Sequence, residues 1–136
     1  MRKPAACLIA FLAASPASAE SYMTGTWFGQ GQPDDKSAMY IDRMRADGTW
    51  RGEYRVCIKG KPPKDDIQEG RWKLDGDILT LGVETVGGQF WPRTDTYKIL
   101  EHSPKAQKYL SLGYKFTYTP QRVADDFKMP SCDLTS

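Results

Sequence analysis

The sequence has few of the residues that metal sites and nucleophilic catalysis require. It contains one histidine, His102, and three cysteines among 136 residues. A histidine without accompanying cysteines or histidines cannot build an ordinary zinc site. Ser103 follows His102 directly, but adjacency in the sequence is not the geometry of a catalytic triad. Acidic pairs such as Asp34-Asp35 stand in expected loops and lack the ligand spacing of a calcium-binding loop. We therefore expect no metal, no cofactor and no catalytic residues, and the sequence predicts a protein that is not an enzyme.

The sequence also lacks an apolar run long enough to cross a bilayer, which takes about 20 residues. The run Ala5–Ala14 is shorter, follows two basic residues and precedes the small-residue cleavage motif Ala17-Ser18-Ala19, which is the order of an export signal. This pattern predicts a signal peptide over residues 1–19. Glu20 stands after the motif where a lipoprotein needs cysteine, so we expect an exported, periplasmic or secreted protein without a membrane anchor.

A surplus of charge of one sign is missing as well. The whole chain has 19 Lys and Arg against 17 Asp and Glu, but two of the basic residues lie in the signal segment. The 117 residues that follow are therefore balanced, with 17 charges of each sign. A neutral domain offers no global reason to bind nucleic acid or an anionic membrane. Its length predicts one domain, residues 20–136, and we expect a monomer.

Two cysteines remain after Cys7 leaves with the signal segment. An even number of cysteines in an oxidising compartment predicts a disulfide, here between Cys57 and Cys132. Cys57 stands on the polar side of an alternating segment, so this bond predicts that the tail crosses the outside of the sheet. The tail after Pro120 fits either a short strand ending near Val123 or one helical turn.

Alternation of apolar and polar residues dominates the rest of the chain. From Thr49 to Lys59, Trp50, Tyr54 and other apolar residues occupy every second position, which is the period of a strand with one buried face. The same period marks the expected strands Glu69–Asp75, Ile78–Glu84 and Tyr109–Tyr118, the last with Leu110 and Leu112 on its apolar face. Tyr22–Gln32 is the expected first strand, and Ser37–Arg45 and Gln89–Leu100 are two weaker ones.

Tight-turn dipeptides separate these segments. Asp47-Gly48, Asp75-Gly76 and Gly87-Gly88 supply the positive φ that hairpins need, so they predict three antiparallel hairpins. Strands that each have one apolar face must curl or stack to bury it. The sequence predicts an all-β fold, a seven- or eight-stranded antiparallel up-and-down barrel.

Short motifs resemble a known family. Gly25-Thr26-Trp27 resembles the Gly-x-Trp signature of the lipocalin and calycin superfamily, and residues 46–50 and 70–81 resemble hairpins of small bacterial lipocalin-like domains. The resemblance implies that Trp27 plugs one end of a barrel and that Arg122, from the last strand, packs over it by a cation–π contact. It also implies a barrel that holds a small apolar or amphipathic molecule.

The four tryptophans of the sequence allow two interpretations: they line a ligand pocket, or they form a core that fills the barrel. On the strand Gln89–Leu100, Arg93 and Asp95 face the side of Trp91 unless a bulge at Pro92 changes the register. That pair could orient a polar ligand or form a structural ion pair. The candidate ligand-binding residues are Trp50, Tyr54, Trp72, Arg93 and Tyr114.

The sequence therefore predicts a non-enzymatic extracytoplasmic binding module. The first hypothesis is a lipocalin-like barrel with a small apolar or amphipathic ligand, which requires an internal cavity of several hundred cubic ångströms, within the range of about 300–1,000 Å³. The alternative is a protein-interaction module, such as a periplasmic inhibitor of a protease or lysozyme. That alternative predicts a filled barrel and a partner surface on the long loops or on Glu20–Thr24.

Overall fold

The computed structural model describes residues 22–32 and 35–132, and their regular structure is entirely antiparallel β. The expected signal peptide, residues 1–19, lies outside the described residues, as does the start of the segment Glu20–Thr24. In the described part of the chain, no helix is long and apolar enough to span a membrane. The strands are β1 Gly25–Gln32, β2 Asp35–Met44, β3 Thr49–Val56, β4 Lys64–Asp75, β5 Ile78–Val86, β6 Gln89–His102, β7 Gln107–Ser111, β8 Thr117–Tyr118 and β9 Gln121–Val123.

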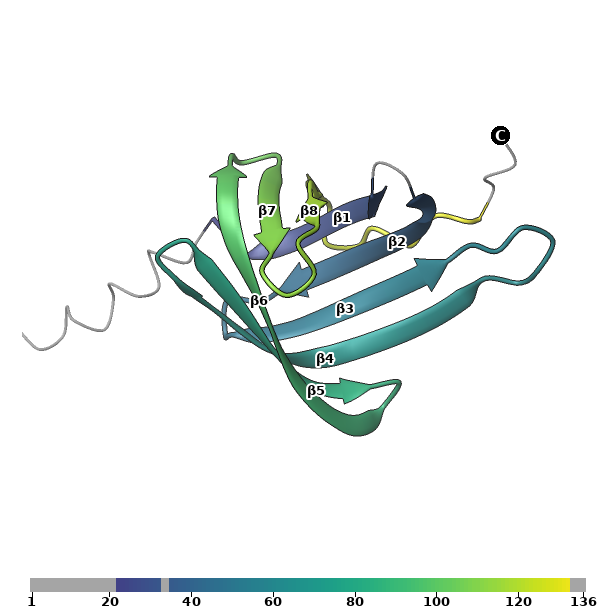
Figure 1. The fold of residues 1–136 in the computed structure, drawn as a ribbon, viewed down its shortest axis with the longest axis horizontal. Coiled ribbons are helices and arrows are strands. Elements are labelled where there is room, and N and C mark those ends of the chain that lie inside the picture. The colour runs from purple at the N-terminus through teal and green to yellow at the C-terminus, as the bar shows by residue number, and fades with distance from the viewer. Residues whose placement is uncertain (1–21, 33–34, 133–136) are drawn as a thin grey trace, which may run out of the picture.

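The strands form a single sheet that curls into a half-barrel (Figure 1). Its order is β8-β7-β6-β5-β4-β3-β2-β1-β9, so each strand from β1 to β8 pairs with its neighbours in sequence and β9 returns to pair with β1. In the described residues the sheet has nine strands, against the seven or eight predicted from the sequence. The all-β antiparallel class is as predicted.

Three predicted hairpins are confirmed. Gly48, Gly76, Gly87 and Gly88 have φ values of 88°, 64°, 60° and 81° in the turns that join β2 to β3, β4 to β5 and β5 to β6. A residue with a Cβ rarely adopts this backbone conformation, which explains why glycine stands at each turn.

One expected strand, Tyr109–Tyr118, is wrong because a turn divides it into β7 and β8. The amide of Ser111 donates to the carbonyl of Phe116 at 2.7 Å, the amide of Lys115 donates to the carbonyl of Ser111 at 2.8 Å, and Lys115 has a φ of 63°. The buried residues of β7 are Gln107, Tyr109 and Ser111, so the predicted apolar face through Leu110 is also wrong.

The concave face of the sheet holds the main core. Register places Met44 opposite Trp50 and Trp72 opposite Leu81, and these large side chains pack together at one end of the half-barrel. The cluster comprises Met23, Trp27, Met44, Trp50, Trp72, Leu79, Leu81, Val83, Ile99 and Tyr109.

The convex face of β1 to β3 is covered by the C-terminal tail. The hydroxyl of Thr26 donates to Asp125 at 2.9 Å, Arg43 donates to the carbonyl of Phe127 at 2.8 Å, and the rings of Phe28 and Phe127 are 5.2 Å apart. The tail explains why Ile41, which faces away from the concave core, has no exposed surface.

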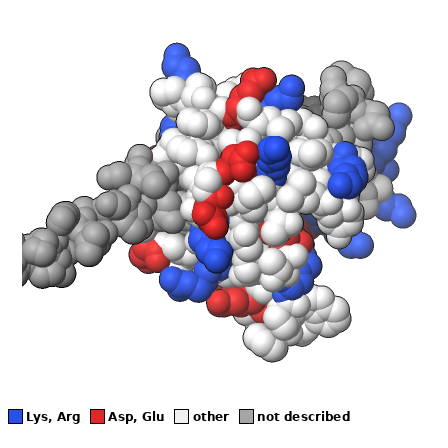
Figure 2. Space-filling view, turned by 60° about the vertical axis from the view of Figure 1, so that its left-hand side comes forward, with Lys and Arg blue, Asp and Glu red and all other residues white. Residues whose placement is uncertain are grey.

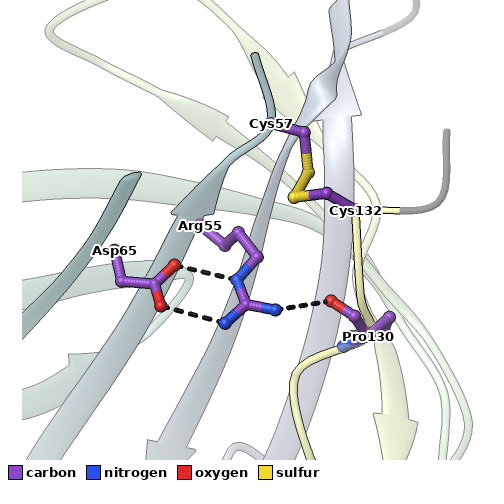
Figure 3. Close-up of a disulfide and its surroundings, with 5 residues drawn as sticks. All are labelled: Arg55, Cys57, Asp65, Pro130 and Cys132. Carbon is purple, nitrogen blue, oxygen red and sulfur yellow. Dashed lines mark hydrogen bonds and ion pairs between the residues drawn. A yellow bond between two sulfur atoms is a disulfide. The ribbon is translucent and has the colours of Figure 1, made fainter. Parts of the chain in front are cut away.

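The predicted disulfide is present and pins this tail (Figure 3). The Cα atoms of Cys57 and Cys132 are 5.5 Å apart, and Arg55 beside them bonds both carboxylate oxygens of Asp65 and the carbonyl of Pro130. The expectation that Cys57 points outward and holds the tail outside the sheet is confirmed. Of the two alternatives for the tail after Pro120, the strand is observed, as β9.

Charged residues of both signs share the surface. Figure 2 shows acidic and basic side chains interspersed on one face. On the convex side, Arg51 pairs with Glu69 at 3.1 Å and Arg55 with Asp65 at 2.8 Å. Such exposed pairs add little stability, but their charged side chains lie on the polar face of the strands that the alternation predicted.

Candidate functional site

One end of the half-barrel is sealed by Arg122 and Trp27. The guanidinium carbon of Arg122 lies 4.3 Å from the centroid of the buried Trp27 ring. The same group donates to the backbone carbonyls of Tyr22 at 3.2 Å, Thr24 at 2.9 Å and Pro104 at 2.7 Å. A Cβ on Gly25 would approach Arg122 to 2.1 Å, so glycine leaves space for the arginine. We call this end the sealed end.

Backbone hydrogen bonds join the two sides of the curled sheet at the sealed end. Gln121 and Ala106 form an antiparallel β-bridge. The amide of Gln107 donates to the carbonyl of Pro120 at 3.0 Å, and the amide of Arg122 donates to the carbonyl of Lys105 at 2.8 Å. His102 ends β6 here; its side chain is exposed and stacks on Tyr22 with ring centroids 3.8 Å apart.

Five tyrosine rings meet on the concave face beyond the sealed end. The hydroxyls of Tyr40 and Tyr109 are 3.4 Å apart, and neighbouring ring centroids in the group are separated by 5.2–6.4 Å. The backbone of Gly29 lies under Tyr40, because a Cβ there would come within 2.1 Å of the ring. This tyrosine cluster comprises Tyr40 on β2, Tyr54 on β3, Tyr97 on β6, Tyr109 on β7 and Tyr118 on β8.

Asp42 of β2 projects into the same space. Its Oδ1 accepts a 3.0 Å hydrogen bond from the indole Nε1 of Trp50. Burial raises the pKa of Asp42 to about 6, and the bond from Trp50 opposes that shift. Burial also raises the pKa of Tyr54 and Tyr109 well above the usual value, so these hydroxyls stay neutral.

A cavity of about 30 Å³ lies beside Asp42. A single water needs about 10–15 Å³ on this measure, and sites for drug-sized ligands occupy about 300–1,000 Å³. The cavity therefore has room for a very small molecule or group. Its walls come from Met23, Trp27, Asp42, Met44, Tyr54, Leu79, Leu81, Tyr97, Gln107 and Tyr109.

Arg93 and Asp95 form a pair on β6, further from the sealed end. Arg93 contacts Asp95 at 3.1 Å and donates to Gln68 at 2.9 Å. Arg93 pairs in register with buried Val83, and the register shifts between Val83 and Thr85, opposite the segment that includes Pro92. Both features considered from the sequence, an Arg–Asp pair on the concave face and a bulge near Pro92, are thus present.

The five candidate ligand-binding residues do not form one site. Trp50 and Trp72 are buried in the core, and the Trp72 indole donates to the carbonyl of Arg45 at 2.9 Å. Tyr54 lines the cavity, Arg93 lies on the concave face beyond it, and Tyr114 is 71% exposed in the turn before β8. The structure therefore brings only Tyr54 to the cavity wall together with the tyrosines.

Asp42 is not among the candidate residues predicted from the sequence. Asp42 occupies an inward position between Tyr40 and Met44, where an apolar residue would continue the pattern. A single acidic residue at an inward position of a strand was the available signal, but the irregular alternation of Ser37–Arg45 concealed which face was inward.

Large aromatic side chains are exposed at the end opposite the sealed end. Phe90 and Trp91 are 76% and 65% exposed on the hairpin of β5 and β6, and Tyr114 and Phe116 are exposed in the turn between β7 and β8. In an antiparallel meander both turns point away from the sealed end, but β7 is short and Ser111 pairs with Tyr97, so the second turn lies beside the middle of β6. The amide of Leu112 donates to the carbonyl of Thr96 at 3.0 Å and fixes the second turn beside β6. We call these four residues the open-end aromatics.

Comparison with known proteins adds no family. No protein-family model matches the chain, and no curated protein matches its sequence. Within residues 22–32 and 35–132, no three His, Cys, Asp or Glu side chains are grouped as metal ligands. Conclusions about function therefore depend on the geometry of the half-barrel.

Proposed function

We propose that the protein is an exported, non-enzymatic protein-interaction module of lipocalin-like type, and that it binds its partner with the open end of the half-barrel. The main support for this proposal is the exposure of the open-end aromatics, above all Phe90 and Trp91. Exposed aromatic groups of this size are enriched in the centres of protein interfaces, where their burial supplies much of the binding energy.

The size of the cavity favours a protein partner over a carried lipid or similar molecule. A volume of about 30 Å³ is far below what a small apolar or amphipathic ligand needs. The tyrosine cluster and the tryptophans fill the remaining interior. The first hypothesis from the sequence, carriage of such a ligand, therefore has the weaker support.

An extracytoplasmic hydrolase is the class of partner that we propose, because small exported disulfide-bonded barrels resemble some protease and lysozyme inhibitors. The Cys57–Cys132 bond suits an oxidising compartment. The hairpin of β5 and β6 presents Phe90 and Trp91 on a short connection through Gly87 and Gly88, which suits insertion into a cleft.

The test is inhibition of purified hydrolases. The protein is titrated against a panel of lysozymes and secreted serine proteases, and residual activity is measured. We expect inhibition of at least one enzyme and a loss of at least tenfold in affinity for Trp91→Ser, about 1.4 kcal/mol. Leu100→Ser is the matched control, since Leu100 is a 45% exposed apolar residue near the other end of β6.

Two outcomes would count against this function. One is an absence of inhibition across the panel, and the other is equal inhibition by the wild type and Trp91→Ser. Native mass spectrometry of the purified protein provides an independent check, because a co-purifying apolar ligand would instead support the carrier hypothesis.

A further inference from the structure

Asp42 brings a carboxylate to the concave face without a cation beside it. Of its two oxygens, Oδ1 accepts the bond from Trp50, and no described residue donates to Oδ2. The ion pairs of the described residues join arginines to Glu53, Glu69, Asp65 and Asp95, and none includes Asp42. Asp42 is half-buried, and a carboxylate that loses water without gaining a counter-charge destabilises a fold, so its presence here requires an explanation.

Aromatic rings surround this carboxylate. Trp27, Tyr54, Tyr97 and Tyr109 line the cavity together with Asp42. The face of an aromatic ring attracts a cation, and the attraction grows when both groups are shielded from water. Because burial keeps the tyrosine hydroxyls neutral, Asp42 supplies the only formal charge in the cavity wall. The wall therefore favours a positive ligand and disfavours an anion.

Hydrogen-bond acceptors add to this preference. Buried Gln107 also lines the cavity, and its side-chain amide nitrogen donates to the sulfur of Met23 at 3.6 Å, a contact that does not use its amide oxygen. Together with Oδ2 of Asp42, that oxygen provides two acceptors for a group that carries several N–H donors. Two arginines of the described residues lie near the cavity lining, and both are already bonded: Arg93 to Asp95 and Gln68, and Arg122, over Trp27, to three backbone carbonyls.

The volume limits the ligand to a small head group. About 30 Å³ holds an ammonium or methylammonium ion, and it excludes a quaternary ammonium group with four methyls. A longer amine would fit only with its alkyl chain directed out of the cavity.

We propose that the cavity beside Asp42 is a binding site for the ammonium head of a primary amine, with the carboxylate as counter-ion and the aromatic rings as its walls. The site is independent of the proposed partner-binding surface, since none of the open-end aromatics lines the cavity.

The test is titration of the full chain with methylammonium in amine-free phosphate buffer. The indole ¹H–¹⁵N resonance of Trp50 reports on the site because that group bonds Asp42, and the other tryptophan indoles serve as internal references. We expect a saturable shift of the Trp50 resonance. We expect no saturable shift with methanol, which has the same size and no charge, or with tetramethylammonium, which is too large.

Two variants distinguish binding in the cavity from general electrostatic attraction of methylammonium to the protein. Asp42→Asn keeps an acceptor for Trp50 and removes the charge, and we expect at least a tenfold loss of methylammonium affinity. Glu69→Gln, which removes a carboxylate on the convex side and outside the cavity wall, should bind within twofold of the wild type. In the wild type, the ¹³Cγ resonance of Asp42 should move with the same midpoint as the indole, a readout that requires no variant.

The proposal is overturned if methylammonium gives no saturable shift, if Asp42→Asn binds as tightly as the wild type, or if the Asp42 ¹³Cγ resonance does not move. Equal binding of tetramethylammonium would also overturn it. Because Trp91→Ser leaves this cavity intact, failure of hydrolase inhibition and failure of amine binding are distinguishable.

Discussion

Arg122 covers the indole of Trp27, with its guanidinium carbon 4.3 Å from the ring centroid. The contact joins the last strand to the first, which pair directly through Trp27 and Arg122 in register. The three carbonyls that Arg122 also binds lie on the segment before β1 and on the turn after β6. One side chain thus holds three separate parts of the chain at the sealed end.

Arg122→Ala should therefore destabilise the protein. Loss of the cation–π contact and of hydrogen bonds from a charged donor is expected to cost about 1–3 kcal/mol of unfolding free energy. Urea denaturation followed by tryptophan fluorescence measures this value. Arg45→Ala is the control, because Arg45 is exposed and its side chain makes a long 3.4 Å bond to Thr49 and a solvent-exposed electrostatic contact with Asp47. Equal costs for the two variants would contradict the role assigned to Arg122.

The disulfide should contribute strongly to stability because it closes a long loop. Cys57 and Cys132 are separated by 75 positions, and the chain-entropy estimate for such a loop is about 4 kcal/mol. Replacement of both cysteines by serine should lower the urea midpoint and increase hydrogen exchange in β1 and β2, where the tail covers Ile41. Reductant should lower the stability of the wild type and leave the double variant unchanged. An unchanged midpoint after full reduction would refute this.

Gly70 should not tolerate a side chain. A Cβ at Gly70 would lie 2.0 Å from the carbonyl oxygen of Gly82, which is backbone and cannot rotate away. We expect Gly70→Ala to cost more than about 2 kcal/mol through the shift it forces on β4 and β5. Gly82→Ala is the matched control, since its nearest contact would be 3.8 Å, and it should change stability by less than about 1 kcal/mol. Thermal unfolding of both variants measures these changes in stability.

Asp42 should make stability fall as the pH rises from about 4 to 6. Its pKa is raised to about 6 in the folded protein, from 3.8 in the reference state, so the folded state holds this proton more tightly than the unfolded chain. The cost of ionising Asp42 is absent below pH 4 and complete above pH 6. The advantage of Asp42→Asn over the wild type should thus grow across this range by about 1–3 kcal/mol.

Unfolding free energies of the two proteins at pH 4 and pH 7, in buffers free of amines, measure this change. The difference between the proteins removes the contributions of all other groups. A difference that is constant with pH, or that falls as the pH rises, would show that Asp42 is not held in the environment described.

Much of the sheet could be predicted from local pattern. Alternation around Trp50 and the glycine turns at Gly48 and Gly76 are local features, and each produced the expected hairpin. The strand expected over Tyr109–Tyr118 failed for the same reason, because apolar residues at every second position continued across a turn. That turn is stabilised by contacts within residues 111–116, including the Ser111 hydroxyl that accepts from the amide of Tyr114.

The candidate site was less accessible to sequence reasoning. The cavity depends on how strongly the sheet curls, since curvature brings Tyr40 of β2 to within hydrogen-bonding distance of Tyr109 of β7. Gly29 and the Tyr40 ring fit together across two strands, a relationship without a local signal. Asp42 is recognisable as unusual only once the inward face of β2 is known.

The sequence by itself determined the all-β class, the main hairpins, the outward direction of Cys57 and its pairing with Cys132, because alternation, turn residues and cysteine count are properties of short segments or of composition. Only the tertiary structure decided that nine strands form a half-barrel, that its interior is nearly full, and that Asp42 stands among tyrosines with no ion-pair partner among the described residues. Those features depend on the curvature of the whole sheet and on side chains that meet from distant strands, which no local pattern specifies.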